Sequence, residues 1–278
     1  MKEIDDNEIK VFADRLKNIS DYDFSGYSDK SLKRRLAKLL FDNDLDFEIF
    51  LEKMEQDKSF LEKVVKKITV NTTELFRDPA VWNSIRNEIL PLFRNYLPLN
   101  IWHAGCSTGQ EVYSMLILLN ELNLFETSNM YATDINSDVL EIARTGIYKY
   151  MFNLNYLDNF DKVIRQNHSG QYIDVEYSKY FTIDKKRDVI KMNPFLMDKP
   201  VYKKMDLVRD TNPFPAKFEL IVCRNVIIYF NYELQNRVIK LFYDNLSAGG
   251  CLILGVHETI LGPFSIFFEK KYQAYFKK

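Results

Sequence analysis

Four short apolar runs recur in the later part of the chain, each bounded by polar residues or glycine. They occupy residues 101–104, 130–133, 220–223 and 251–255. Strands of a parallel sheet that is covered on both faces are apolar at every position, so these runs are typical of such strands. Helix-length stretches at 111–122 and 232–246 separate the first pair and the last pair. This alternation predicts an α/β fold with a doubly wound parallel sheet.

The first quarter of the chain has a different pattern, with apolar residues at helical spacing. Ile9, Phe12, Leu16 and Ile19 begin the series, which continues to residue 68. The segment contains a single glycine, Gly26, and no proline. We therefore predict an all-helical N-terminal domain over residues 1–72, followed by the sheet-containing domain over residues 73–278.

Residues 148–202 fit neither pattern well. They are rich in aromatic residues and include alternating segments at 172–175 and 189–192. We interpret this stretch as an inserted small β subdomain. The tail at 267–276 alternates between polar and apolar residues, which is typical of an edge strand.

Composition and charge exclude several classes of protein. The 278 residues include 38 Lys and Arg against 39 Asp and Glu, so net charge gives no reason to expect nucleic acid as a partner. No apolar run approaches the roughly 18 residues of a membrane-spanning helix, and the first residues do not resemble a signal peptide. The three cysteines are scattered without a CxxC pair, which argues against a disulfide framework or a zinc site. We expect a cytoplasmic protein with no bound metal and no insertion into a membrane.

The run IWHAGCSTGQEVYSM at 101–115 predicts a strand, a glycine turn and a helix. Gly105 and Gly109 would let the backbone turn sharply and approach a ligand without a Cβ clash. The free N–H groups at the start of the following helix suit an anionic group of a ligand. A simple tight turn explains the same two glycines equally well, so this motif alone does not establish a ligand site.

Asp134, at the end of the next apolar run, strengthens the case for a ligand site. A carboxylate at the tip of the strand after a glycine loop commonly binds the hydroxyls of a ribose. No Lys-Ser or Lys-Thr pair follows Gly109, which excludes a phosphate-binding P-loop, and the third glycine of a NAD site is missing. The pattern favours an adenosine cofactor without phosphate. The alternative role for Asp134 is to cap the following helix.

Six motifs occur in order along the chain: NTTELFRDP at 71–79, HAGCSTGQEVYS at 103–114, ATDIN at 132–136, ARTGIY at 143–148, FELIVCRNVIIYFN at 218–231 and LSAGGCLILGVHE at 246–258. Together they resemble the CheR-type chemotaxis receptor methyltransferases over nearly the whole chain. The resemblance implies the Rossmann-like fold of a class I methyltransferase with S-adenosyl-L-methionine as cofactor and S-adenosyl-L-homocysteine as product. It also implies methyl esterification of glutamate side chains on chemoreceptors, a step of chemotaxis signal transduction.

The resemblance further implies which residues contact the cofactor. They lie in four of the motifs and in one further pair, and comprise Asn71, Thr73, Arg77, Gly105, Gln110, Glu111, Asp134, Asp206, Leu207, Arg224 and Asn225. Two of them depart from the usual family pattern, since Gln110 replaces a Glu and Asp206 replaces an Asn. We expect the Gln110 amide to accept a hydrogen bond from the methionine ammonium group, with Glu111 as the candidate to restore the lost charge attraction. Asp206 can still pair with the amino group of adenine.

Methyl transfer to a glutamate carboxylate needs no general base, because a carboxyl group with a pKa of about 4.3 is ionised at neutral pH. The protein must instead align the reacting atoms and exclude water. Tyr229, in the CRNVIIYF segment, is the candidate to pack and hydrogen-bond beside the methyl group. An equally good interpretation is that Tyr229 is only an aromatic residue of the hydrophobic core. Arg77 is the second candidate catalytic residue, which we expect to orient the cofactor or the incoming carboxylate.

Residues 30–38, in one predicted helix, include no acidic residue and five basic residues: Lys30, Lys33, Arg34, Arg35 and Lys38. Methylation helices of chemoreceptors are rich in glutamate, so this helix is the candidate docking surface for them. Such a charge run is often only a solvated face.

The alternative function for the chain is a non-catalytic CheR-like domain that binds the cofactor or a signalling partner, because Gln110 and Val256 depart from the family pattern. A small-molecule or RNA methyltransferase is disfavoured by the motifs and by the absence of an aromatic and basic surface stretch.

Overall fold

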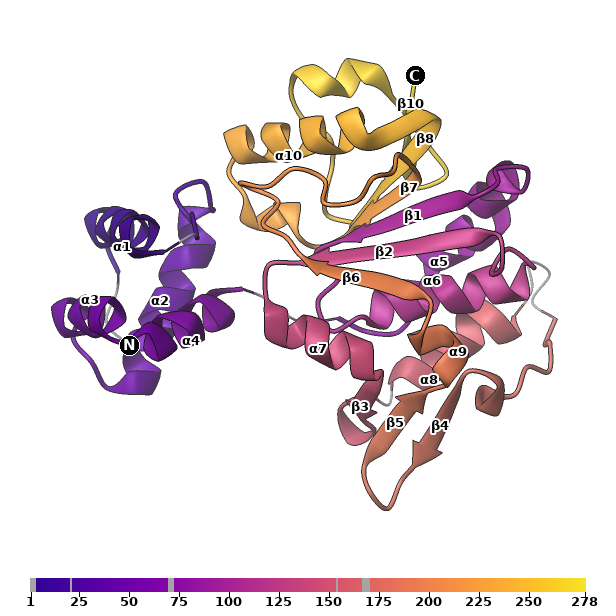
Figure 1. Ribbon diagram of the computed structural model, residues 1–278, viewed down its shortest axis with the longest axis horizontal. Coiled ribbons are helices and arrows are strands. Elements are labelled where there is room, and N and C mark those ends of the chain that lie inside the picture. The colour runs from indigo at the N-terminus through magenta and orange to yellow at the C-terminus, as the bar shows by residue number, and fades with distance from the viewer. Residues whose placement is uncertain (1–3, 21, 70–72, 154, 167–170) are drawn as a thin grey trace.

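The computed structural model describes residues 4–20, 22–69, 73–153, 155–166 and 171–278. Figure 1 shows two groups of elements: four helices near the N-terminus, and a larger body built around a sheet. No helix in these ranges is both long enough and apolar enough to cross a membrane. Within the same ranges, no group of His, Cys, Asp and Glu side chains is placed to hold a metal ion.

The N-terminal helices are α1 (Asp6–Ile19), α2 (Asp29–Asn43), α3 (Phe47–Gln56) and α4 (Lys58–Ile68). Their apolar faces enclose a separate core in which Phe12, Leu36 and Phe50 are completely buried. Asp5 begins α1 with a capping box, in which its side chain accepts from the backbone of Glu8 and the Glu8 side chain accepts in return. The helical pattern predicted for this region is therefore present.

The main sheet has seven strands in the order β6-β2-β1-β7-β8-β10-β9. Their bounds are β1 (Leu99–Ala104), β2 (Ser128–Asp134), β6 (Pro200–Lys204), β7 (Phe218–Cys223), β8 (Leu246–Leu254), β9 (Phe268–Lys271) and β10 (Ala274–Lys277). The strands from β6 to β8 are parallel, and β10 and β9 pair antiparallel. The doubly wound sheet predicted from the four apolar runs is confirmed. The tail, predicted as one edge strand, instead forms two strands.

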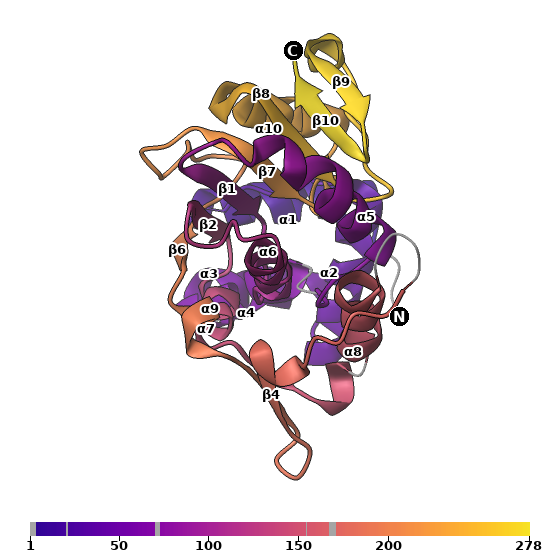
Figure 2. The ribbon, with the colours of Figure 1, turned by 90° about the vertical axis from the view of Figure 1, so that its right-hand side faces the viewer.

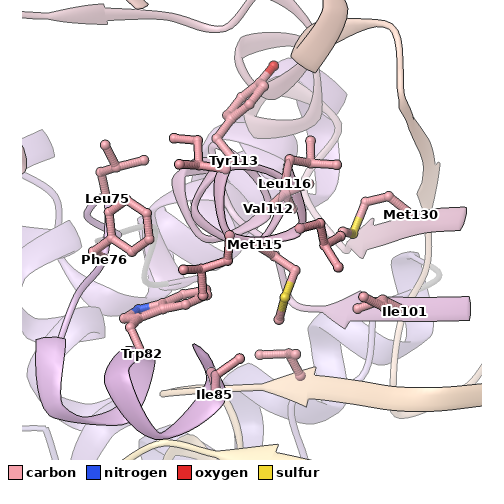
Figure 3. Close-up of a cluster of buried hydrophobic side chains, with 14 of the residues drawn as sticks. Leu75, Phe76, Trp82, Ile85, Ile101, Val112, Tyr113, Met115, Leu116 and Met130 are labelled. Atoms are coloured by element: carbon pink, nitrogen blue, oxygen red, sulfur yellow. The ribbon is translucent and has the colours of Figure 1, made fainter. Parts of the chain in front are cut away.

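Helices cover both faces of this sheet, and successive residues of β1 belong to opposite cores. Ile101 packs with α6 (Gln110–Glu121), whereas Trp102 packs with α10 (Tyr232–Asn245). Figure 2 shows α6 and α10 on opposite sides of β1 and β7. In Figure 3, Met115 of α6 points toward Trp82 of α5 (Pro79–Ser84) and Ile101 of β1, whereas Tyr113 projects from the opposite side of the helix. A helix buried on nearly every side gives the preceding glycine loop a fixed support.

A second sheet of three antiparallel strands lies between β2 and β6 in the chain. It has the order β3-β5-β4, with β3 (Ile147–Lys149), β4 (Phe181–Asp184) and β5 (Val189–Met192). The helices α7 (Ser137–Thr145), α8 (Asn155–Phe160) and α9 (Pro194–Met197) accompany it. The small β subdomain is confirmed, but the segment at 172–175 forms only a single bridge, from Tyr172 to Gln166. The last residues of the predicted insertion, 200–202, instead belong to β6 of the main sheet.

Candidate functional site

Two adjoining cavities open where β1, β2 and β7 end, and Gly105, Asn225 and Val226 line both of them. The larger contains about 610 Å³ of empty space, its mouth included, and the smaller about 400 Å³. The carboxyl ends of parallel strands are where α/β sheets bind small organic molecules. The predicted cofactor residues that line one or both are Thr73, Arg77, Gly105, Glu111, Asp134, Asp206, Leu207, Arg224 and Asn225.

The glycine loop follows β1 and forms the floor shared by the two cavities. Gly105 has a φ of +78°, and a Cβ atom placed there would lie 2.6 Å from Cγ2 of Val226. Ser107 and Asn225 also have positive φ, at 50° and 60°, although they carry side chains. Strained residues of this kind gather at functional sites, where the surrounding structure holds them in place. Gly105 is therefore required both for its backbone angle and for the close approach of Val226.

The carboxylate of Asp134 lies at the tip of β2 and is almost entirely buried in the wall of the larger cavity. Its Oδ2 accepts from the backbone N–H of Ser107 at 2.8 Å, and its Oδ1 accepts from that of Asn136 at 2.9 Å. Burial raises the pKa of Asp134, against the effect of these backbone donors. Asn136, and not Asp134, caps α7. The capping alternative for Asp134 is therefore excluded.

Asp206 lines the same cavity from the loop after β6. Its Oδ1 accepts from the backbone N–H of Val208 at 2.8 Å, but its buried Oδ2 has no partner among the described residues. Burial raises the pKa of Asp206 to about 6. An unpaired buried oxygen at a cavity wall suits a ligand that brings a hydrogen-bond donor.

The smaller cavity is lined by charged side chains of both signs. Glu111 Oε2 accepts from Nη1 of Arg224 at 3.1 Å, and Arg224 Nη2 donates to Oδ2 of Asp78 at 2.7 Å and to the backbone oxygen of Arg77 at 3.1 Å. The Arg224 side chain is 1% exposed. Burial opposes ionisation of Glu111, but the hydrogen bond from His103 and the charge of Arg224 outweigh it and lower the pKa of Glu111. Arg77 and Thr73 complete the wall.

The loop after β7 carries Asn225, Val226 and Tyr229, and the buried carboxylate of Glu258 holds it in place. Glu258 accepts from the backbone N–H groups of Asn225 at 2.8 Å, Gly255 at 2.7 Å and Ile228 at 3.1 Å. Sequence reasoning missed this role of Glu258. The only signal in the sequence is a single acidic residue shortly after β8, and an acidic residue of an ordinary turn would give the same signal. Tyr229 is half-buried and lines the larger cavity.

The N-terminal helices contribute to the larger cavity, which the sequence did not indicate. Tyr27 and Arg35 line it, and the Arg35 guanidinium lies 4.8 Å from the ring centroid of Tyr229. Arg35 also donates to the backbone oxygen of Ile68. Backbone hydrogen bonds from Ser28 to Tyr229, 2.7 Å, and from Asn231 to Gly26, 2.8 Å, join the segment before α2 to the loop that carries Tyr229.

The basic residues of α2 are therefore not equivalent. Arg35 faces the cavity, and Lys33 pairs with Asp6 at 2.6 Å. Lys30, Arg34 and Lys38 are exposed, and none has an ion-pair partner among the described residues.

Gln110 does not line either cavity. Its Oε1 accepts from the Thr108 hydroxyl at 2.7 Å, and its Nε2 donates to the Tyr156 hydroxyl at 2.7 Å. The amide thus braces the glycine loop against α8, while its neighbour Glu111 faces the cavity. Asn71 lies outside the described residues.

Comparisons with known proteins identify the family of this chain. The model of the CheR methyltransferase SAM-binding domain matches residues 71–275. Cher3 of Pseudomonas putida is 34% identical over 277 residues, which cover 98% of this chain and 97% of the relative. A chemotaxis protein methyltransferase of Borreliella burgdorferi is 31% identical over 83% of this chain and 80% of the relative, and one of Listeria innocua is 28% identical over 87% and 86%. The chain therefore belongs to the CheR methyltransferase family, with its S-adenosylmethionine-binding domain over residues 71–275.

Proposed function

We propose that this protein transfers the methyl group of S-adenosylmethionine to glutamate carboxylates of chemoreceptors, giving methyl esters. The proposal is carried by one observation, the pair of adjoining cavities whose polar groups match the two halves of the cofactor. Two of the relatives described above are named chemotaxis protein methyltransferases, which supports the choice of substrate.

The larger cavity fits the adenosine half. Asp134 has a second lone pair on each carboxylate oxygen beyond those used by Ser107 and Asn136, so it can accept from both ribose hydroxyls. The unpaired Oδ2 of Asp206 can accept from the amino group of adenine. Leu207 supplies an apolar surface in the same wall.

The smaller cavity fits the amino-acid half. A zwitterion needs an anion for its ammonium group and a cation for its carboxylate. Glu111 supplies the first, and Arg77 is placed in the same wall to supply the second. Arg224 holds Glu111 and the carbonyl of Arg77, so it fixes the distance between the two.

When bound, S-adenosylmethionine supplies an electrophilic methyl group on sulfur. The residues of this chain need only hold the acceptor carboxylate in line with that methyl group and keep water away from it. Tyr229 lies at the wall of the larger cavity, where its ring excludes water and its hydroxyl can orient the acceptor. Arg35, over the Tyr229 ring, fixes the orientation of this side chain.

The exposed residues Lys30, Arg34 and Lys38 occupy one face of α2 at helical spacing. The next residue after Arg34 is Arg35, which reaches the cavity. One helix, α2, therefore carries both the candidate docking face and a residue of the larger cavity's wall. An acidic helix attracted to the first would come close to the second. We propose that the enzyme acts in the cytoplasm, where receptor methylation helices lie.

The test is to incubate the protein with S-adenosylmethionine labelled in its methyl group and with receptor-enriched membranes. Base-labile label on a band of receptor size is the expected result. Cofactor binding without transfer would support the alternative, a non-catalytic signalling domain. Base-stable label would point to a different acceptor.

A further inference from the structure

Behind the smaller cavity, four side chains form a continuous series of contacts. His103 Nδ1 lies 3.1 Å from Oε1 of Glu111, Oε2 of Glu111 lies 3.1 Å from Arg224, and Arg224 lies 2.7 Å from Asp78. Glu111 and Arg224 line the cavity. His103 belongs to β1 and is completely buried, with an exposed side-chain fraction of 0%. Its imidazole therefore reaches the cavity only through Glu111.

The two oxygens of Glu111 are held by different partners on different elements. Oε1 contacts His103 in β1, and Oε2 contacts Arg224 just after β7. The terminal torsion of a glutamate side chain has a broad, shallow potential, so one contact alone would leave the carboxylate free to turn. Two contacts on opposite oxygens fix its plane. Because Glu111 is ionised, Nδ1 of His103 carries the proton and donates it to this bond.

The other ring nitrogen of His103 indicates that packing alone does not explain this residue. Nε2 is buried and has no hydrogen-bond partner among the described residues. Leaving a polar atom in that state is unfavourable, and an apolar side chain of similar size would avoid the cost. The contact of Nδ1 with Glu111 is the favourable interaction that offsets it.

We propose that His103 is a positioning residue that holds Glu111 in the orientation required by the ammonium group of the methionine half of the cofactor. The inference rests on the proposed function, because it assigns the smaller cavity to that half. It adds a residue that does not touch the ligand and that none of the sequence motifs identified as functional.

The test compares two ligands in three proteins. S-adenosylhomocysteine carries the amino-acid half, whereas methylthioadenosine carries the adenosine and sulfur without it. Calorimetry measures both affinities for the unchanged protein, for His103→Leu, which fills the space without a donor, and for His103→Asn, whose amide can donate from nearly the same place as Nδ1. We expect His103→Leu to weaken S-adenosylhomocysteine about tenfold and methylthioadenosine less than about twofold. His103→Asn should recover most of the lost affinity.

Equal weakening of both ligands by His103→Leu would overturn the proposal, because a general defect of folding or of the glycine loop affects the shared adenosine half. An unchanged affinity for S-adenosylhomocysteine would overturn it as well. Failure of the proposed function is a separate outcome, since the unchanged protein would then bind neither ligand, or would bind both equally well.

Discussion

The backbone N–H of Ser107 donates a hydrogen bond of 2.8 Å to Oδ2 of Asp134, which joins the glycine loop after β1 to the tip of β2. Asp134 therefore has two functions in this structure. It fixes the backbone of the loop, and it presents its remaining lone pairs to the larger cavity. Changes at Asp134 should consequently affect ligand affinity more than a single lost contact would suggest.

Replacing Asp134 by Ala should weaken binding of S-adenosylhomocysteine at least tenfold. Each hydrogen bond to a charged acceptor contributes about 1.5–3 kcal/mol, and the variant leaves the ribose hydroxyls without an acceptor. Calorimetry measures the effect. Glu141→Ala, which removes an exposed carboxylate from α7, is the matched control and should bind normally. Unchanged affinity in a folded Asp134→Ala protein would remove this residue from the ribose site.

Asp206→Asn should retain affinity for S-adenosylhomocysteine within about threefold, because an amide oxygen can still accept from the amino group of adenine. Asp206→Leu has no acceptor and should lose about tenfold or more. Calorimetry of the two variants separates the need for an acceptor from the need for a charge. If the Leu variant binds as well as the Asn variant, the adenine contact lies elsewhere.

Asp206 also predicts a dependence of stability on pH. Its pKa of about 6 in the folded protein lies above the ordinary value of 3.8, so its contribution is fully present below about pH 4 and is lost as the pH rises through 6. The loss is up to about 3 kcal/mol, from 1.36 kcal/mol for each pKa unit. Urea unfolding between pH 4 and 7 should show Asp206→Asn gaining stability relative to the unchanged protein as the pH rises. The exposed Asp158→Asn should show no such gain.

The sequence predicted the centre of the sheet because the middle parts of β1, β2, β7 and β8 are largely buried on both faces and so are largely apolar. It did not predict β6, which lies at an edge, where most of its side chains are exposed and no apolar run is needed. The tail was expected to be one strand. The turn at Tyr272 and Gln273, both with positive φ and neither a glycine, concealed the division into β9 and β10.

In the candidate site, too, some residues could be predicted from the sequence and others could not. Asp134 was predicted because it directly follows an apolar run in the sequence, and such a run marks a strand whose end can be located from the sequence alone. Arg35 was assigned to an outer face because the spacing of α2 does not say which side meets another element, and only the tertiary contact with Tyr229 does. His103 and Glu258 lie within two of the motifs, but they contact other residues and not a ligand, so the motifs did not reveal their roles.

Replacing Arg34 and Lys38 together by Glu should slow receptor methylation and flatten its dependence on salt, because attraction over about 10 Å is lost. Affinity for S-adenosylhomocysteine should not change. The same charge change at exposed Lys10 and Lys63, on α1 and α4, is the matched control. Equal slowing by both pairs would mean that net charge, and not this face of α2, governs the encounter.

Tyr229→Phe should lower the rate of methyl transfer about tenfold and leave the affinity for S-adenosylhomocysteine within about twofold, because only the orienting hydroxyl is lost. Single-turnover kinetics at saturating cofactor measures the chemical step. A Tyr229 that serves only as a core aromatic would tolerate the loss of its hydroxyl, so an unchanged rate would exclude the orienting role.

In the proposed function, the methyl acceptor is a glutamate carboxylate on a chemoreceptor. Mass spectrometry of receptor peptides after incubation with the enzyme and S-adenosylmethionine tests this acceptor, with a reaction that lacks the enzyme as the control. We expect methyl esters on glutamate side chains of the cytoplasmic helices, removed by mild base and absent with the control. Methyl groups on nitrogen or sulfur atoms, or receptor peptides without any modification while the protein binds the cofactor, would contradict the account.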